Sequence, residues 1–342
     1  MKPFYYVGLD LHKKTIAYCI KRIDGKIVDE GTLVSRREDI IGWCETMPGP
    51  WIGAMEATIF TGWVYEAMKP YAAELQVGNP IMMKAIGAAK KKNDKLDART
   101  IADLSRCDLL PRSYMPPPHI RELRRVLRFR NTLVRQAVRM KNKTATILMD
   151  VGAEYVKKKL HGNKYFHELV GSLTDVPQSV IELLQLSRGA YELFDSCQKK
   201  LIKNLSSHPE LKRRVDLLKT IRGVGEVTAL TWALEIGEPE RFTSINRAVS
   251  YCGLCSALDE SAGKSKRGPI SKQRNKHLQS TLIEAAKLAP FWNVSLGAVY
   301  DKKRQSGSNY NEATISVARK LVAYLLAVDK SGRPFIQKGV CI

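Results

Sequence analysis

The chain has 342 residues, of which 44% are hydrophobic and 26% are charged, as in a globular protein with two or three domains. It shows no apolar run of the roughly 18 residues that a membrane span needs, no apolar signal-peptide core and no regular cysteine spacing, so we expect a cytoplasmic protein without a disulfide framework. Its formal net charge of +22 favours a polyanionic partner over enhanced solubility or an acidic protein partner.

The first 110 residues carry a net charge of only +2 and alternate between strand and helix patterns. Short apolar or alternating runs bounded by turn residues predict strands, and longer runs with one apolar face predict helices. The resulting order is that of an α/β RNase H-like fold, which we assign to residues 1–112. The predicted strands are Phe4–Leu11, Thr15–Ile23, Lys26–Val34, Trp51–Glu56 and Glu74–Val77, and the predicted helices are Arg37–Met47, Gly62–Tyr71 and Asp94–Cys107.

Four carboxylates fall at the ends of these predicted elements. Asp10 and Glu56 lie at or near the ends of apolar strands, where a charge is costly unless it is paired or binds a metal. Asp94 and Asp97 share one face at the start of a helix, a spacing that fits N-terminal capping as well as catalysis. Together the four side chains supply the oxygen ligands that two Mg²⁺ ions need for in-line attack on phosphate.

Residues 111–160 carry a net charge of +10 and centre on a long predicted helix. The triplet Pro116–Pro118 predicts a linker, and the following segment Ile120–Met149 contains no Gly or Pro. On a helical wheel one face is mostly apolar and carries Ile120, Leu123, Val126, Leu127, Leu133, Val134, Ala137 and Leu148. The opposite face is cationic and carries Arg121, Arg124, Arg125, Arg128, Arg135, Arg139 and Lys143.

Several partners would suit this helix, which we assign to a helical coiled-coil or linker region over residues 113–215. A helix that lies on a membrane surface has the same pattern of one apolar and one cationic face. A solvated charged face is the simplest explanation, although such faces usually mix both signs of charge. Because Arg pairs well with phosphate, we favour nucleic acid for the cationic face and expect no membrane partner. The apolar face either docks within the chain or forms a coiled-coil dimer seam.

The rear of the chain, residues 216–342, carries a second basic block and is predicted to be mainly α-helical. Gly223 and Gly225 separate two apolar helical stretches, as in a helix–hairpin–helix turn whose backbone amides bind a DNA phosphate. Any tight turn between helices uses glycine, so this signal is weak alone. The stretch from Lys264 to Lys276 adds six Lys or Arg residues and no acid.

Six segments spread over nearly the whole chain carry a family likeness: GLDLHKK, MEAT, KNDKLDARTIADL, RELRRVLRFRNTLVRQ, IRGVGEVTA and ISKQRNKHL. Through them the sequence resembles the DEDD-type insertion-sequence transposases, whose front domain is similar to the RuvC Holliday-junction resolvase. The resemblance implies that Asp10, Glu56, Asp94 and Asp97 bind Mg²⁺ or Mn²⁺. It also implies recombination between donor and target DNA, guided by a noncoding RNA of the element, in a homo-oligomer such as a dimer or tetramer.

The same resemblance implies a rear-domain serine that becomes covalently linked to DNA. The family's serine falls on Ser261, and Ser256 and Ser265 are its competitors. The sequence departs from the family pattern here, with Ser256 where Pro is usual, Ala262 where Gly follows the serine, and Arg274 where Gly is usual. We expect Lys264, Lys266 and Arg267 to contact nucleic acid and to stabilise charge on the attacked phosphate. We expect Lys272 and Arg274 to contact nucleic acid as well.

Three other functions compete with a recombinase. A junction resolvase would hydrolyse DNA with the four carboxylates alone, but it would need little of the basic rear half. An ATP-handling protein of the actin and sugar-kinase fold would place a Gly/Thr turn after its first Asp, where this chain has Leu11–Lys14. A catalytically dead nucleic-acid scaffold would not keep all four acids. The sequence therefore favours an insertion-sequence recombinase that performs phosphoryl transfer.

Overall fold

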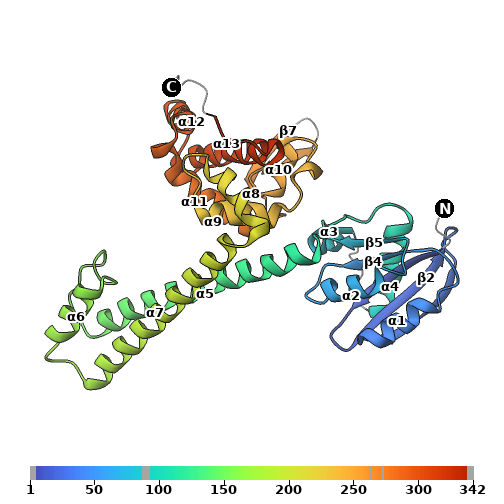
Figure 1. The fold of residues 1–342 in the computed structure, drawn as a ribbon, viewed down its shortest axis with the longest axis horizontal. Coiled ribbons are helices and arrows are strands. Elements are labelled where there is room, and N and C mark those ends of the chain that lie inside the picture. Colours follow the sequence, from blue (N-terminus) through green and yellow to red (C-terminus); the bar gives the residue numbers. More distant parts are fainter. Residues whose placement is uncertain (1–4, 87–92, 262–263, 272, 337–342) are drawn as a thin grey trace. The chain divides into compact units, whose positions relative to one another are not determined.

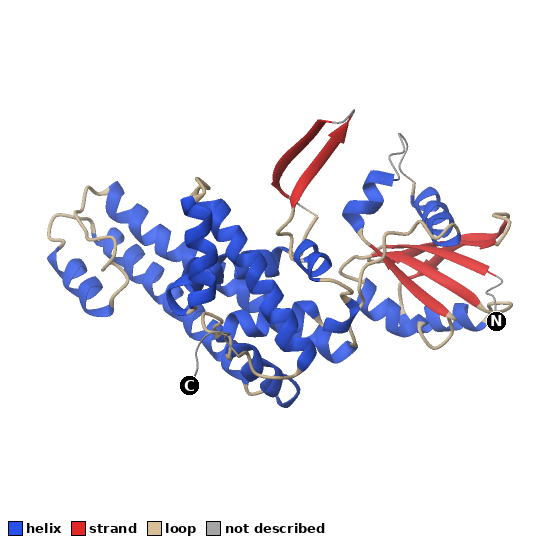
Figure 2. Cartoon of the chain, turned by 90° about the horizontal axis from the view of Figure 1, so that it is seen from above, coloured by secondary structure: helices blue, strands red, loops and turns tan. Residues whose placement is uncertain are grey.

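The computed structural model describes residues 5–86, 93–261, 264–271 and 273–336. The chain divides into two compact units, Met1–Pro118 and His119–Ile342. The first unit is mixed α/β, and the second is helical except for one two-stranded ribbon (Figure 1, Figure 2). Of the helices in the described ranges, none is both long and apolar enough to cross a membrane.

The front unit is built on a five-stranded sheet with the strand order β3-β2-β1-β4-β5. Its strands are β1 (Tyr5–Leu11), β2 (Thr15–Arg22), β3 (Ile27–Val34), β4 (Trp51–Glu56) and β5 (Glu74–Gly78). β1, β2 and β3 form an antiparallel meander, whereas β1, β4 and β5 run parallel. The meander needs only short turns, but each parallel pair needs a longer crossover, which here contains a helix.

Helices cover both faces of this sheet (Figure 1). On one face α1 (Arg37–Glu45) and α2 (Thr61–Met68) bury a cluster that includes Leu9 from the central strand. On the other face α4 (Asp94–Arg106) packs on β1, β2 and β4. Because strand side chains alternate between the faces, Gly8 and Asp10 face α4 while their neighbours face the α1/α2 cluster.

Every predicted strand and helix of the front unit is present, with ends shifted by at most three residues. The structure adds α3 (Pro80–Ile86), which the sequence analysis missed because a seven-residue helix shows too little periodicity. The mixed α/β character of the front and the helical character of the rear are therefore confirmed.

The rear unit begins with the long helix α5 (Pro118–Asp150), which packs against α7 (Gln178–Ser206) (Figure 1). The prediction that Pro118 belongs to a linker was wrong. Proline is tolerated at a helix start, because the first N–H groups of a helix have no partner within it. α6 (Asn163–Ser172) closes the far end of this pair around a small apolar cluster that includes Leu148 and Phe166.

The apolar face of α5 docks within the chain over its first half, where Leu127 is fully buried in the main core of the rear unit. That core is formed by α8 (Pro209–Lys219), α9 (Glu226–Ile236), α10 (Ile245–Tyr251), α11 (Lys276–Trp292), α12 (Val294–Gln305) and α13 (Tyr310–Ser331). A ribbon of β6 (Ser256–Ser261) and β7 (Lys264–Ile270) projects from these helices (Figure 2).

Candidate metal centre and nucleic-acid interface

Close packing of α4 on β1 brings the helix start to the end of the strand. A Cβ built on Gly8 would lie 2.0 Å from the Ala98 carbonyl oxygen and 2.4 Å from the Ala102 nitrogen. Only glycine allows the two backbones to approach this closely. Asp10, two residues further along the same face of β1, therefore lies beside the first turn of α4.

The sheet register places Glu56 next to Asp10. β1 and β4 are parallel, and Leu9 pairs with Met55, so the next residue of each strand falls at the same level. Ala54, two residues before Glu56, packs against Ile101 of α4. Since alternate residues share a face, Glu56 lies on the α4 face as well. Two strand-end carboxylates thus occupy neighbouring positions on one face.

The start of α4 supplies two more carboxylates, and they are not the helix cap. Asn93 is the N-cap residue, and its side chain accepts a hydrogen bond from the Lys95 backbone N–H. Asp94 and Asp97 lie in the first turn. The capping explanation for these two residues is therefore wrong, and both side chains are left for another role.

His12, which the sequence alone did not single out, lies with Asp10 and Asp94, whereas Glu56 and Asp97 are not part of this group of converging donor atoms among the described residues. The Nε2 of His12 lies 3.0 Å from Asp10 Oδ2 and 3.5 Å from Asp94 Oδ1. Donor atoms of Asp10, His12 and Asp94 all lie within 4.8 Å of one another. The available signal was its position two residues after Asp10, because that spacing along an extended chain returns a side chain to the same face.

Burial and the neighbouring acids disfavour the charged form of the Asp10 carboxyl. Burial raises the pKa of the Asp10 carboxyl, and the charges of Asp97 and Asp94 raise it further. The His12 side chain opposes the rise through its charge and its hydrogen bond. A divalent cation would relieve the repulsion among these carboxylates, and oxygen and imidazole donors are suitable ligands for one.

On α5, the predicted cationic face divides into two parts. Arg124 and Arg128 turn towards the fully buried Glu235 of α9. Arg128 donates two 2.7 Å hydrogen bonds to its carboxylate, and Arg124 donates to the Leu234 carbonyl. Asn275, the N-cap of α11, donates to the same carboxylate at 2.8 Å. Arg124 is therefore buried, and Arg128 is ion-paired within the chain although 44% of its side chain is exposed.

The wheel could not reveal this inward turn, because it shows the faces of one helix and not the acid that another helix brings to it. Arg125, Arg135, Arg139 and Lys143 remain exposed on α5. Arg121 is half-buried. The cationic surface is therefore narrower than predicted and lies mostly on the distal half of the helix.

A groove of about 640 Å³ is lined both by part of this cationic surface and by the turn that contains Gly223 and Gly225. It is lined by Arg130 and Arg135 of α5, by Gly223 and Gly225, and by Lys276 at the start of α11, among others. Two predicted nucleic-acid elements that are 88 residues apart in the chain therefore border one cavity. Its charge and its backbone amides suit a phosphate group.

The two glycines of the turn have different structural reasons. Gly223 has φ +94°, and an added Cβ would lie 2.8 Å from the Cα of Ala289 in α11. Gly225 has an extended backbone at the N-cap of α9, and nothing lies within 4 Å of its added Cβ. The left-handed backbone and the packing of α11 explain why residue 223 is glycine. Gly225 has neither constraint, and it leaves the start of α9 open to the groove.

The ribbon carries the serine segment. β6 ends at Ser261, which pairs with Lys264 at the start of β7, and the same register pairs Ser265, Lys266 and Arg267 with β6 residues. The side chains of residues 257–267 and of Lys272 lie outside the described part of the structure, and Ser261, Lys264, Lys266 and Arg267 are among them. Arg274 donates a hydrogen bond to the Ser271 carbonyl.

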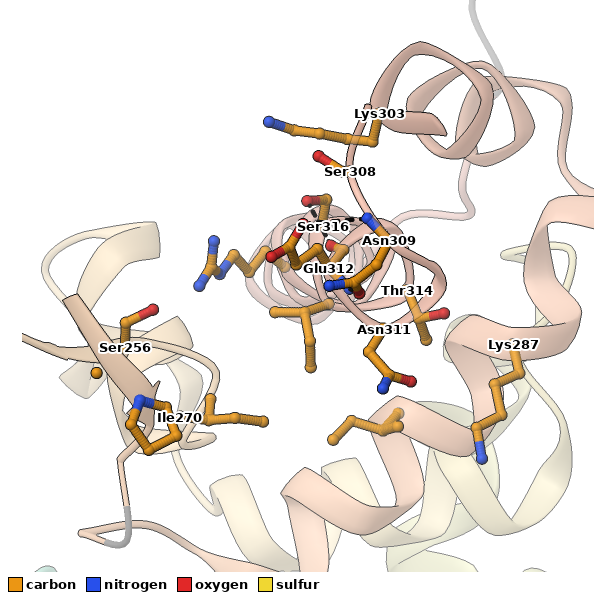
Figure 3. A pocket seen from close by; sticks show the side chains of 15 residues that line it. Ser256, Ile270, Lys287, Lys303, Ser308, Asn309, Asn311, Glu312, Thr314 and Ser316 are labelled. Carbon is orange, nitrogen blue, oxygen red and sulfur yellow. Dashed lines mark hydrogen bonds between the residues drawn. The ribbon is translucent and has the colours of Figure 1, made fainter. Parts of the chain in front are cut away.

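Ser256, at the base of the ribbon, borders a cavity of about 820 Å³ (Figure 3). Lys287 of α11 and Lys303 of α12 line the same cavity, as do Asn309 and Asn311 at the start of α13. Lys287 already pairs with Glu284 at 2.6 Å. Polar and apolar side chains both line the cavity, and Ser256 is exposed, but no general base among the described lining residues contacts Ser256.

Comparison with known proteins gives two family matches. A transposase model of the DEDD IS110 type matches residues 7–152, and a model for the Transposase IS116/IS110/IS902 family matches residues 215–301. The transposase for insertion sequence element IS1328 of Yersinia enterocolitica is 23% identical over 293 residues, which cover 82% of this chain and 83% of that protein.

Two further relatives match over shorter regions. The pilin gene-inverting protein of Moraxella bovis is 31% identical over 129 residues, covering 37% of this chain and 40% of that protein. The y4qE protein of Sinorhizobium fredii is 24% identical over 223 residues, covering 65% of this chain and 54% of that protein. The chain thus spans about half the length of these two relatives.

Proposed function

The chain belongs to the IS110-type DEDD transposases, and from this premise we propose that it is a DNA recombinase that cleaves and rejoins strands by phosphoryl transfer. The observation that carries the proposal is the convergence of Asp10, Asp94 and His12 where β1 ends and α4 begins. The strand order β3-β2-β1-β4-β5 with α4 across it supports an RNase H-like, RuvC-like front domain.

In this proposal the carboxylates of Asp10, Glu56, Asp94 and Asp97 hold Mg²⁺ or Mn²⁺. Their oxygen donors fit such ions, and a cation would relieve the repulsion among the charges of Asp10, Asp94 and Asp97. When bound, the metal supplies charge stabilisation to a phosphate under attack. The chain's own part is to fix the carboxylates on two strands, β1 and β4, and on the helix α4, which packs closely on β1.

The substrate in this proposal is DNA, held by cations of the rear unit and guided by an element-encoded RNA. The groove that joins Arg135 to Gly223 and Gly225 would hold the phosphate backbone of one nucleic acid. Arg125, Arg139 and Lys143 would extend the contact along α5. Because such contacts are to phosphate, they position nucleic acid without selecting its sequence.

Ser261 is the proposed nucleophile. Its Oγ would attack a DNA phosphorus, and the new Oγ–P bond would replace the bond to the leaving nucleotide oxygen, which takes up a proton. In the second step a DNA hydroxyl attacks the same phosphorus, and the serine oxygen recovers a proton as the strand is rejoined. The covalent link conserves the phosphodiester energy, so that rejoining needs no other energy source.

The experiment is a comparison of cleavage and binding. Asp10→Asn and Asp94→Asn should lower the cleavage rate in Mg²⁺ by at least about a hundredfold. DNA affinity should stay within about twofold, because affinity derives from Lys and Arg of the rear unit. Asp39→Asn is the matched control, since Asp39 of α1 is ion-paired with Arg36, just before the helix, and with no other cation among the described residues. An Asp10→Asn protein that cleaves at the wild-type rate would exclude the proposed metal centre.

A further inference from the structure

We infer that His12 is a direct nitrogen ligand of the metal centre, and that this ligand shifts the preference of the centre from Mg²⁺ towards Mn²⁺. The inference rests on the proposed function, because it concerns the same site. It adds a donor of a different chemical class to the four carboxylates, and with it a metal preference.

The distances around His12 match those around a single ion. Metal–ligand bonds to nitrogen and oxygen are about 2.0–2.3 Å long, so two ligands of one ion lie at most about 4.6 Å apart. His12 Nε2 lies 3.0 Å from Asp10 Oδ2 and 3.5 Å from Asp94 Oδ1. Those separations suit neighbouring ligands, and the imidazole contacts both carboxylates with one and the same nitrogen.

The backbone fixes His12 in this place. Its N–H donates a 2.9 Å hydrogen bond to the Thr15 carbonyl, which closes the turn between β1 and β2. Asp10 lies two residues earlier on the paired strand β1. The histidine side chain is 48% exposed, whereas that of Asp10 is 15% exposed. The imidazole is thus more accessible to an incoming cation than the Asp10 carboxylate.

A purely structural role of His12 would predict a different result for substitution by lysine. In that case a protonated His12 would act as the cation that neutralises two carboxylates, and a lysine would serve equally well. Lysine has a longer and more flexible side chain that remains protonated and cannot ligate a metal at neutral pH. Substitution by lysine therefore separates charge neutralisation from metal ligation.

The chemistry of the nitrogen donor determines the metal preference. Mg²⁺ is hard, prefers oxygen and gives up its water reluctantly, whereas imidazole suits first-row transition metals. An imidazole within the first coordination shell therefore favours Mn²⁺ over Mg²⁺ relative to a site of carboxylates alone. Its removal should weaken Mn²⁺ binding more than Mg²⁺ binding.

The test uses the full-length protein loaded with Mn²⁺ and examined by pulsed electron paramagnetic resonance. The wild-type protein should show ¹⁴N coupling to Mn²⁺, and the coupling should change to ¹⁵N when histidine is isotopically labelled. His12→Ala and His12→Lys should both lose this coupling and raise the Mn²⁺ dissociation constant by about tenfold or more. His119→Ala, which alters an exposed histidine of α5, is the control and should change neither.

The outcomes separate this inference from the proposed function. Mn²⁺ binding that depends on Asp10 but shows no nitrogen coupling would overturn the role of His12 and leave the carboxylate centre standing. Absence of Asp10-dependent Mn²⁺ binding would overturn both. Full retention of nitrogen coupling in His12→Ala would assign the coupling to another residue and would also overturn the inference. The measurement on wild-type protein needs no substitution, so it does not depend on how the variants fold.

Discussion

Replacing Glu235 by glutamine should be among the most destabilising single changes in the rear unit. The Glu235 side chain is fully buried and accepts two hydrogen bonds from Arg128 and one from Asn275. Glu235→Gln keeps the size of the side chain but removes its charge and turns an N–H₂ group towards these donors. It also leaves Arg124, which is largely buried, without its nearby negative charge.

The size of the effect follows from these contacts. Hydrogen bonds to charged groups contribute about 1.5–3 kcal/mol each, and loss of two gives about 3–6 kcal/mol. Breaking a buried ion pair by removing one partner costs about 3–5 kcal/mol by direct measurement on other proteins. We therefore expect a loss of about 3–5 kcal/mol in the free energy of unfolding of the rear unit. Since each 1.4 kcal/mol is tenfold, amide protection in α9 should fall by about a hundredfold or more.

Hydrogen–deuterium exchange of α9 measures this loss without requiring the two units to unfold together. Glu284→Gln is the matched control, because Glu284 pairs with Lys287 at 2.6 Å on an exposed surface. Such a surface pair contributes only about 0–1 kcal/mol. Equal protection of α9 in the two variants would refute the argument that Glu235 anchors α5 to α9 and α11.

The same carboxylate predicts a pH dependence. Burial raises the pKa of Glu235, but the hydrogen bonds and charge of Arg128 outweigh burial and hold the pKa below its ordinary value of 4.5. A carboxyl whose pKa is lower in the folded state adds stability above its unfolded pKa, and this stability is lost as the pH falls through the folded pKa. Protection of α9 should therefore fall below about pH 4.5 in the wild type and change less in Glu235→Gln.

Two further changes test the glycine turn and the cationic face. Gly223→Ala should lower the free energy of unfolding by about 1–3 kcal/mol in a denaturant titration, because its backbone is left-handed and α11 lies against it, whereas Gly225→Ala should cost under about 1 kcal/mol. Equal losses would contradict this assignment. Reversal of Arg125, Arg135 and Arg139 to Glu should make the negative slope of log affinity against log salt shallower by about 2.7, at roughly 0.9 per phosphate contact. An unchanged slope would remove α5 from the nucleic-acid interface.

The front unit was predictable because its signals are local. β4 begins and ends at the predicted residues, since Trp51–Glu56 is a short apolar run between a Pro-Gly-Pro turn and a helix. The four acids stood out for a similar reason, as charges at the ends of such runs. His12 did not, because its signal was the spacing of two residues from Asp10 alone, and its second partner, Asp94, lies 82 residues further along the chain.

The rear unit was less predictable because its decisive contacts are distant in sequence. Arg128 and Glu235 are 107 residues apart, and the helical wheel of α5 shows Arg128 on the same face as Arg135. The docked position of α9 pairs Arg128 with the buried Glu235, whereas Arg135 forms no such ion pair among the described residues. The same docking explains why the apolar face of α5, over the first half of the helix, is buried within the chain instead of remaining free for a partner.

The most direct test of the central proposal is to trap the reaction on a suicide DNA substrate and map the protein–DNA link. After denaturation and digestion, mass spectrometry should find one DNA-linked peptide with the attachment at Ser261, and Ser261→Ala should lose both the link and strand cleavage. Attachment at Ser256 or Ser265 would move the nucleophile within the same mechanism. Full cleavage by Ser261→Ala, with no linked peptide anywhere, would contradict recombination through a serine and identify the protein as a hydrolytic nuclease.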